Sequence, residues 1–202
     1  MIKCITEKDM KEIIFVTGNK GKLASAQKHF DDDVKLFNID FDIVEPEVND
    51  IEYIAEYKVR EAYKKTQKPC IALDAGFYIP NYPGNPNFPG AFPKREILEK
   101  FGVEGLLEKM KGVEDRECYF RECLAYFDGK ELKKFFGTTY GQLTTEKRGI
   151  ATSQKWSDLW YVFIPRNCTK TMAEMNDEER ANRNDGYVSP FIEFRKWFEE
   201  QK

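Results

Sequence analysis

A short apolar run that passes directly into a polar, glycine-containing turn constrains this chain most. Residues 13–16 are β-branched or aromatic, which is typical of a strand buried on both faces of a sheet. Thr17-Gly18-Asn19 then interrupts the apolar run, and from Lys20 onward apolar residues recur at helical spacing. The sequence therefore predicts a strand, a tight turn and a helix N-terminus in direct succession.

Such a junction suits the binding of a phosphate group. The first N–H groups of a helix have no partner within the helix, and the helix dipole places positive charge at the same end. Gly18 lets the backbone come close to a ligand, and Lys22 can place an ammonium on the same anion. Junctions of this kind also occur in α/β proteins that bind nothing there, so the junction alone leaves both interpretations open.

Composition and charge exclude several classes of protein. The 202 residues, 41% hydrophobic and 33% charged, suffice for one generous domain or two small lobes. No apolar run approaches the roughly 20 residues that span a bilayer, and residues 1–11 lack the apolar centre of a signal peptide. A net charge of −3 argues against a general nucleic-acid binder. We expect a cytoplasmic protein with neither nucleic acid nor membrane as a partner.

The cysteines and the histidine exclude further kinds of site. The cysteines are odd in number and show no C-x-x-C spacing, so neither a zinc site nor a disulfide framework is predicted. His29 is the only histidine, which argues against histidine-based catalytic triads. We expect reduced, mostly buried thiols at Cys4, Cys70, Cys118, Cys123 and Cys168.

The rest of the pattern indicates a mixed α/β protein rather than a plain doubly wound sheet. Residues 79–93, rich in proline, predict a surface loop. Strands are predicted at 34–39, 69–73, 117–127, 130–143 and the end of 156–165. Helices are predicted at 51–65 after an Asp50 cap, at 94–109, and from Ser189-Pro190 with Phe191, Phe194, Trp197 and Phe198 facing inward.

Two charged residues occupy unusual positions in these elements. Lys58 falls on the otherwise apolar face of the predicted helix 51–65, where snorkelling of the side chain is the alternative explanation. Asp74 follows the predicted strand 69–73, and carboxylates at such strand ends sit where α/β sheets bind ligands. Capping or turn formation is the alternative for Asp74. Both residues are therefore candidates for ligand binding.

Several segments match one set of motifs in the same order. They are T-G-N-x-x-K at 17–22, Glu45, Lys58, Leu73-Asp74-Ala75-Gly76-Phe77, the proline–glycine loop 88–94, the paired-strand residues 136–137 and 141–143, and Thr171-Met172-Ala173-Glu174-Met175. From about residue 12 to residue 198 this order resembles the inosine triphosphate pyrophosphatase family of nucleotide hydrolases, also called the Ham1 family.

The resemblance implies a fold and an activity. The fold would be mixed α/β, with a long twisted central sheet, flanking helices and two lobes around a cleft. Residues 12–202 would form this single domain, and residues 1–11 would be an N-terminal extension. The activity would be Mg²⁺-dependent hydrolysis of a nucleoside triphosphate to the monophosphate and pyrophosphate, carried out by a homodimer.

The resemblance also implies roles for individual residues. Asp74 would be the catalytic base or water-orienting group, assisted by Lys22, and Glu45 with Asp74 would hold Mg²⁺. Glu47 is an alternative to Glu45 as the metal ligand. The substrate-binding residues would be Thr17, Gly18, Asn19, Lys22, Lys58, Ala75, Lys94, Trp156, Asp158, Trp160, Arg180, Asn184 and Asp185. Trp156 or Trp160 could stack on a nucleobase, although a core role suits either equally well.

The segments that would read the base depart from the family pattern. Ser25 stands where the family has an acid, residues 157–161 replace F-G-Y-D-P, and Asn184-Asp185-Gly186 replaces S-H-R. An ionised Asp185 accepts hydrogen bonds, so an acceptor facing the base would favour an amino group over the keto oxygen of inosine. We therefore predict weakened or lost discrimination for inosine and xanthosine triphosphates. The alternatives are a nucleotide-binding or regulatory module, and another class of nucleotide hydrolase, on the same fold.

Overall fold

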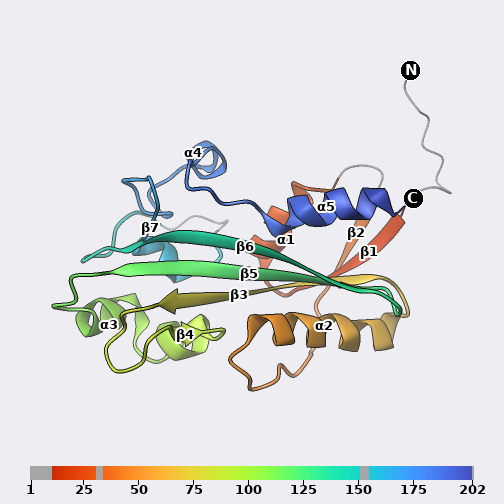
Figure 1. Ribbon diagram of the computed structural model, residues 1–202, viewed down its shortest axis with the longest axis horizontal. Coiled ribbons are helices and arrows are strands. Elements are labelled where there is room, and N and C mark those ends of the chain that lie inside the picture. The colour runs from red at the N-terminus through yellow and green to blue at the C-terminus, as the bar shows by residue number, and fades with distance from the viewer. Residues whose placement is uncertain (1–10, 31–33, 151–154, 202) are drawn as a thin grey trace. The chain divides into compact units, whose positions relative to one another are not determined.

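The computed structural model describes residues 11–30, 34–150 and 155–201 (Figure 1). The chain divides into two compact units. Unit 1 comprises Met1–Asp74, Cys123–Phe136 and Ser189–Lys202, and unit 2 comprises Ala75–Glu122 and Gly137–Val188. Within the described ranges, no helix is both long enough and apolar enough to cross a membrane. Cys4 and nearly all of the predicted extension 1–11 lie outside these ranges. Lys11 is the first residue of a strand.

The strands form one mixed sheet, which confirms the predicted mixed α/β class. Their order is β2-β1-β3-β5-β6-β7, with β4 paired to β3. β1 is parallel to β2 and β3, whereas β4 and β7 are antiparallel to their neighbours β3 and β6. The strands are β1 (Lys11–Val16), β2 (Val34–Ile39), β3 (Cys70–Ile79), β4 (Phe88–Gly90), β5 (Glu117–Phe127), β6 (Leu132–Leu143) and β7 (Phe163–Pro165).

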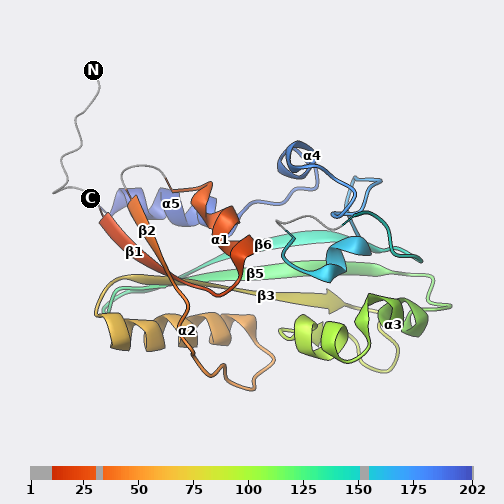
Figure 2. The same ribbon diagram turned by 180° about the vertical axis from the view of Figure 1, so that it is seen from behind.

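In unit 1, helices cover both faces of the sheet. Helices α1 (Lys20–Gln27) and α5 (Pro190–Glu200) lie on one face, and α2 (Ile51–Thr66) lies on the other (Figures 1 and 2). This explains why residues 13–16 are buried throughout. On α5, Phe191, Phe194 and Phe198 are buried as predicted, whereas Trp197 is half-buried. The ring of Phe191 meets that of Phe15 edge to face, with centroids 5.8 Å apart.

The described part of unit 2 contains four short helical segments. These are a π-helix (Lys94–Glu99), α3 (Gly102–Lys109), a 3-10 helix (Asp158–Tyr161) and α4 (Asp177–Ala181). The first three contribute to a buried cluster with the sheet that includes Phe77, Leu106, Leu159 and Phe163, whereas α4 has no buried residue. Cys118 lies in this cluster as a free buried thiol. Cys70 and Cys123, in other parts of the sheet, are also free and buried, in agreement with the prediction.

Three predicted element boundaries were wrong. The helix expected at 94–109 is broken at Gly102, whose φ of +69° places it in the left-handed region. The loop expected at 79–93 contains the short strand β4. The strand expected to end at residue 73 continues to Ile79, because Phe77 and Ile79 are buried in the core of unit 2 and extend the strand past the apparent Asp-Ala-Gly turn.

The Asp50 cap of α2 provides a stability test. Its Oδ1 accepts hydrogen bonds from the N–H groups of Glu52 (2.8 Å) and Tyr53 (3.2 Å). Asp50→Ala should lower the free energy of unfolding by about 1 kcal/mol, because these donors lose their acceptor. Asp50→Asn keeps an acceptor and should unfold at nearly the wild-type urea concentration. Equal losses in both variants would show that the cap does not stabilise α2.

Candidate active site

The turn after β1 is built as the sequence predicts, but its backbone donors are largely occupied. Asn19 caps α1, and its Oδ1 accepts from the N–H groups of Gly21 (2.9 Å) and Lys22 (3.1 Å). The hydroxyl of Thr17 in turn accepts from the Asn19 N–H at 3.1 Å. The expectation of unpaired N–H groups at this helix start therefore does not hold for Gly21 and Lys22. A phosphate bound here would have to rely more on side-chain cations.

Lys22 reaches from α1 to the strand that carries Asp74. Its Nζ donates to the backbone oxygen of Leu73 at 2.9 Å, which holds the ammonium next to Asp74 in the chain. Asp74 lies in the middle of β3 rather than at its end, contrary to the prediction. However, β1 pairs with β3 only at Ile14–Phe15 and ends at Val16. Asp74 therefore lies beyond the end of the neighbouring parallel strand, which is the position that the prediction assumed.

Lys58 joins two carboxylates in this part of unit 1. It comes from α2, and its Nζ lies 2.6 Å from Oε1 of Glu45 and 3.6 Å from Oδ1 of Asp74. The side chains of Lys58 and Asp74 are 15% and 10% exposed, whereas that of Glu45 is 44% exposed. The unusual polar position on α2 is thus explained by an ion-pair cluster rather than by snorkelling alone. Within unit 1, Lys22, Lys58, Glu45 and Asp74 are brought together.

Burial controls the protonation of Asp74. It raises the pKa of this carboxyl above its ordinary value, because loss of water disfavours the charged form. The ammonium groups of Lys22 and Lys58 act in the opposite direction, and the charge of Glu45 adds to the rise. A buried carboxyl with a raised pKa and two adjacent cations is the kind of group found at sites of proton transfer.

The donor set suits a hard divalent cation that shares its coordination with a ligand. Mg²⁺ is usually held in proteins by one or two carboxylates together with substrate phosphate oxygens. Glu45 and Asp74, which contact the same ammonium, provide such a pair. Across residues 11–30, 34–150 and 155–201, no group of three or more His, Cys, Asp or Glu side chains could hold a metal alone. The pair therefore fits Mg²⁺ only if other oxygens complete the coordination.

Sequence reasoning missed Asp40 as a site residue. Its carboxylate lies directly against Gly18, since a Cβ added to that glycine would be 2.6 Å from Asp40 Oδ2. The absence of a side chain at Gly18 thus allows the close approach of a carboxylate to the turn. Asp40 follows β2, which is parallel to β1. Asp40 follows one parallel strand and Gly18 follows its neighbour, so the contact could be expected only once the pairing of these two strands was known.

The remaining predicted site residues belong to unit 2. Lys94 begins the π-helix, is 84% exposed and lies 3.6 Å from Oε1 of Glu99. Ala75 and Trp156 are both half-buried. Asp158 is 53% exposed and forms an ion pair with Lys155.

Trp160 and Arg180 support the core of unit 2. Trp160 packs against the buried cluster, and the guanidinium of Arg180 lies 5.5 Å from the centre of its ring. Arg180 also donates to the backbone oxygens of Met172, at 3.1 Å, and Met175, and forms an ion pair with Asp177. Of the two tryptophans proposed for base stacking, Trp160 thus has a core role, which was the open alternative.

Asp185 is not a free acceptor. Its side chain is 1% exposed, forms an ion pair with Nε of Arg183 and accepts from the Tyr187 N–H at 3.0 Å. The idea that this carboxylate faces the base therefore conflicts with its surroundings. Asn184 is exposed, and its backbone oxygen accepts from Asn167 at 3.0 Å.

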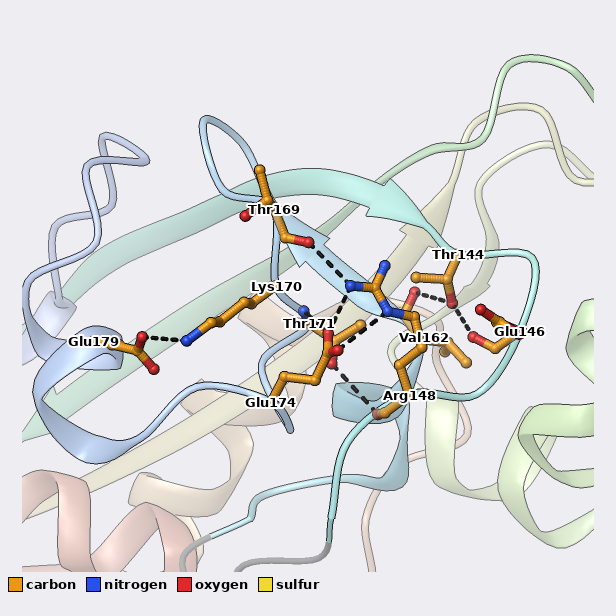
Figure 3. A network of polar contacts seen from close by, with 9 residues as sticks. All are labelled: Thr144, Glu146, Arg148, Val162, Thr169, Lys170, Thr171, Glu174 and Glu179. Carbon is orange, nitrogen blue, oxygen red and sulfur yellow. Dashed lines mark hydrogen bonds and ion pairs between the residues drawn. The ribbon is translucent and has the colours of Figure 1, made fainter.

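The segment Thr171-Met172-Ala173-Glu174-Met175 has a structural role in unit 2 (Figure 3). The Glu174 carboxylate accepts from the Thr171 N–H at 2.7 Å and lies 3.0 Å from Nη2 of Arg148. Arg148 also donates to the backbone oxygen of Thr169 at 3.1 Å. The motif therefore ties the loop that follows β6 to the segment before α4.

Comparisons with known proteins agree on one family. A sequence model of the Ham1 family matches residues 13–185. A dITP/XTP pyrophosphatase of Thermococcus kodakarensis is 30% identical over 189 residues, which cover 93% of this chain and 97% of that protein. A dITP/XTP pyrophosphatase from Methanosarcina acetivorans is 31% identical over 195 residues, which cover 94% of this chain and 98% of that protein. The structure of a HAM1 protein from Coxiella burnetii gives a TM-score of 0.79 at 23% identity and covers 95% of this chain and 100% of that one.

The raised pKa of Asp74 predicts how its replacement changes stability with pH. Ionising Asp74 costs more free energy in the folded protein than in the unfolded chain. The Asp74 carboxyl therefore lowers the free energy of unfolding at pH values above its raised pKa, where it is ionised. Asp74→Asn should therefore unfold at a higher urea concentration than the wild type at pH 7. The difference should shrink as the pH falls and vanish below the ordinary value of 3.8. A variant that is less stable at pH 7 would contradict this assignment.

Proposed function

Because this chain belongs to the Ham1 family, we propose that it is a nucleoside triphosphate pyrophosphatase that requires Mg²⁺. It would hydrolyse a nucleoside or deoxynucleoside triphosphate to the monophosphate and pyrophosphate. The observation that carries the proposal is the cluster of Lys22, Lys58, Glu45 and Asp74 in unit 1. The names of the relatives, which are dITP/XTP pyrophosphatases, support the class of reaction.

The two lysines would bind the triphosphate. A triphosphate carries several negative charges, and hydrolysis at phosphorus proceeds through positioning and charge neutralisation rather than covalent catalysis. Lys22 holds its ammonium beside Asp74, and Lys58 holds a second one there. Thr17, Gly18 and Asn19 would shape the turn against the phosphates. The resemblance to the family also assigns Lys94 to the phosphates as a further cation.

Glu45 and Asp74 would hold Mg²⁺. When bound, Mg²⁺ would offset phosphate charge and polarise the phosphate oxygens. Asp74 would also orient a water molecule and accept its proton. Glu47 stays an alternative to Glu45, but the short contact of Glu45 with Lys58 favours Glu45.

The proposal extends to base preference. The segment at 184–186 provides neither a histidine nor an arginine side chain, and the Asp185 carboxylate is bound within unit 2. We therefore expect weaker discrimination for keto bases, but no active repulsion of the keto oxygen by Asp185. Trp156 is half-buried and Asp158 is exposed, whereas Trp160 packs against the buried cluster. Trp156 and Asp158 are therefore the better candidates for contact with the base.

The remaining parts of the proposal rest on family membership. Residues 12–202 would act as one enzyme domain of two lobes, as a homodimer in the cytoplasm, without nucleic acid as a partner. A nucleotide-binding module without hydrolysis is the alternative, because the base-reading segments have changed. Binding of a triphosphate without release of pyrophosphate would favour that alternative.

Activity assays should separate these functions. With Mg²⁺, the wild type should release pyrophosphate from at least one member of a panel of nucleoside triphosphates, and chelation of the metal should abolish release. Asp74→Asn should lower kcat by about 100-fold or more, because the proton acceptor is lost. Lys22→Met should lower kcat/KM, whereas Lys20→Met, an exposed lysine in the first turn of the same helix, should leave it unchanged. A fully active Asp74→Asn enzyme would refute the assigned role.

The base preference has its own measurement. The ratio of kcat/KM for deoxyinosine triphosphate over deoxyadenosine triphosphate should stay below about 100, because sites that read a base by dedicated hydrogen bonds discriminate by about 10⁴ or more. A ratio in that higher range would show that other residues of this chain replace the missing donors.

A further inference from the structure

The two lysines of the unit 1 cluster are held in different ways. Lys22 donates to a neutral backbone oxygen, that of Leu73. Lys58 instead lies between two carboxylates, 2.6 Å from Oε1 of Glu45 and 3.6 Å from Oδ1 of Asp74. These are the two carboxylates to which the proposed function assigns Mg²⁺. The phosphate-binding lysine and the metal are thus assigned to the same oxygens.

The Lys58 ammonium and Mg²⁺ cannot both contact the Glu45 and Asp74 carboxylates without an electrostatic cost. Mg²⁺ lies about 2.0 to 2.1 Å from its oxygen ligands, so it would stand close to any ammonium that contacts the same carboxylates. Like charges at that separation repel, and Lys58 is only 15% exposed, so water screens the repulsion poorly. The ammonium is the easier of the two to move, because it sits at the end of a flexible four-carbon chain.

We propose that Lys58 competes with the divalent cation for Glu45 and Asp74, and that metal binding releases its ammonium to the substrate phosphates. The inference rests on the proposed function and adds the order of events, in which metal binding precedes the contact of Lys58 with the triphosphate. The metal replaces the positive charge that Lys58 supplies to the two carboxylates. The released ammonium then offsets negative charge on the triphosphate, so the lysine changes from a carboxylate partner to a phosphate partner.

This exchange makes metal and triphosphate binding cooperative. A triphosphate that binds without metal must draw Lys58 away from two carboxylates, whereas with metal bound that ion pair is already broken. By thermodynamic linkage, the triphosphate must strengthen metal binding by the same factor by which the metal strengthens triphosphate binding.

Metal binding without nucleotide tests the competition directly. The probe is Mn²⁺, whose free concentration is read by electron paramagnetic resonance during titration of the full chain. Lys58→Met should bind Mn²⁺ about tenfold more tightly than the wild type, a change of about 1.4 kcal/mol, because the competing cation is gone. The matched control is Lys64→Met. Lys64 also lies on α2 and pairs with a carboxylate, that of Glu61, and its removal should leave Mn²⁺ affinity unchanged.

A second measurement determines the affinity for inorganic tripolyphosphate with and without Mn²⁺. In the wild type, Mn²⁺ should strengthen its binding by a larger factor than in Lys58→Met, since the variant has no ammonium to release. Weaker or unchanged Mn²⁺ binding by Lys58→Met, with circular dichroism and urea unfolding like those of the control, would overturn the competition.

Failure of the competition can be told apart from failure of the proposed function. If the wild type releases pyrophosphate but Lys58→Met gains no Mn²⁺ affinity, only the competition is wrong. If Glu45→Gln and Asp74→Asn both bind Mn²⁺ as the wild type does, the metal assignment itself fails, and the competition fails with it.

Discussion

The buried carboxylate of Asp74 is the constraint on which the candidate site depends. A carboxylate removed from water is costly unless cations or hydrogen bonds offset its charge. Here β3 places Asp74 in the interior, and α1 and α2 each bring a lysine to it. The raised pKa shows that the two lysines offset burial only in part.

The fold of unit 1 supplies this arrangement. β1 ends before β3 does, so the turn at 17–19 and the start of α1 lie beside the continuing strand. The Asn19 and Asp50 caps fix the starts of the two helices that carry Lys22 and Lys58. The same caps occupy backbone donors that an isolated helix start would offer to a phosphate. The site therefore depends on side-chain charge more than on the helix dipole.

Much of this could be predicted from the sequence, because the signals are local. The strand-turn-helix junction, the Asp50 cap, the strand 34–39 and the aromatic face of the last helix each follow from neighbouring residues. The continuation of β3 past Asp74 could not, because burial of Phe77 and Ile79 in unit 2 overrides a local turn signal. Nor could the ion pair of Asp185 with Arg183, because a residue type does not reveal which partner satisfies it. The approach of Asp40 to Gly18 needed strand pairing to be known.

The decisive measurement is the identity of the phosphoanhydride bond that the protein breaks. Wild-type protein would be incubated with Mg²⁺ and deoxyinosine triphosphate, and the products followed by phosphorus nuclear magnetic resonance, beside Asp74→Asn. We expect deoxyinosine monophosphate and pyrophosphate from the wild type, and almost no product from the folded variant. Release of the diphosphate with inorganic phosphate, or equal product from both proteins, would contradict this expectation.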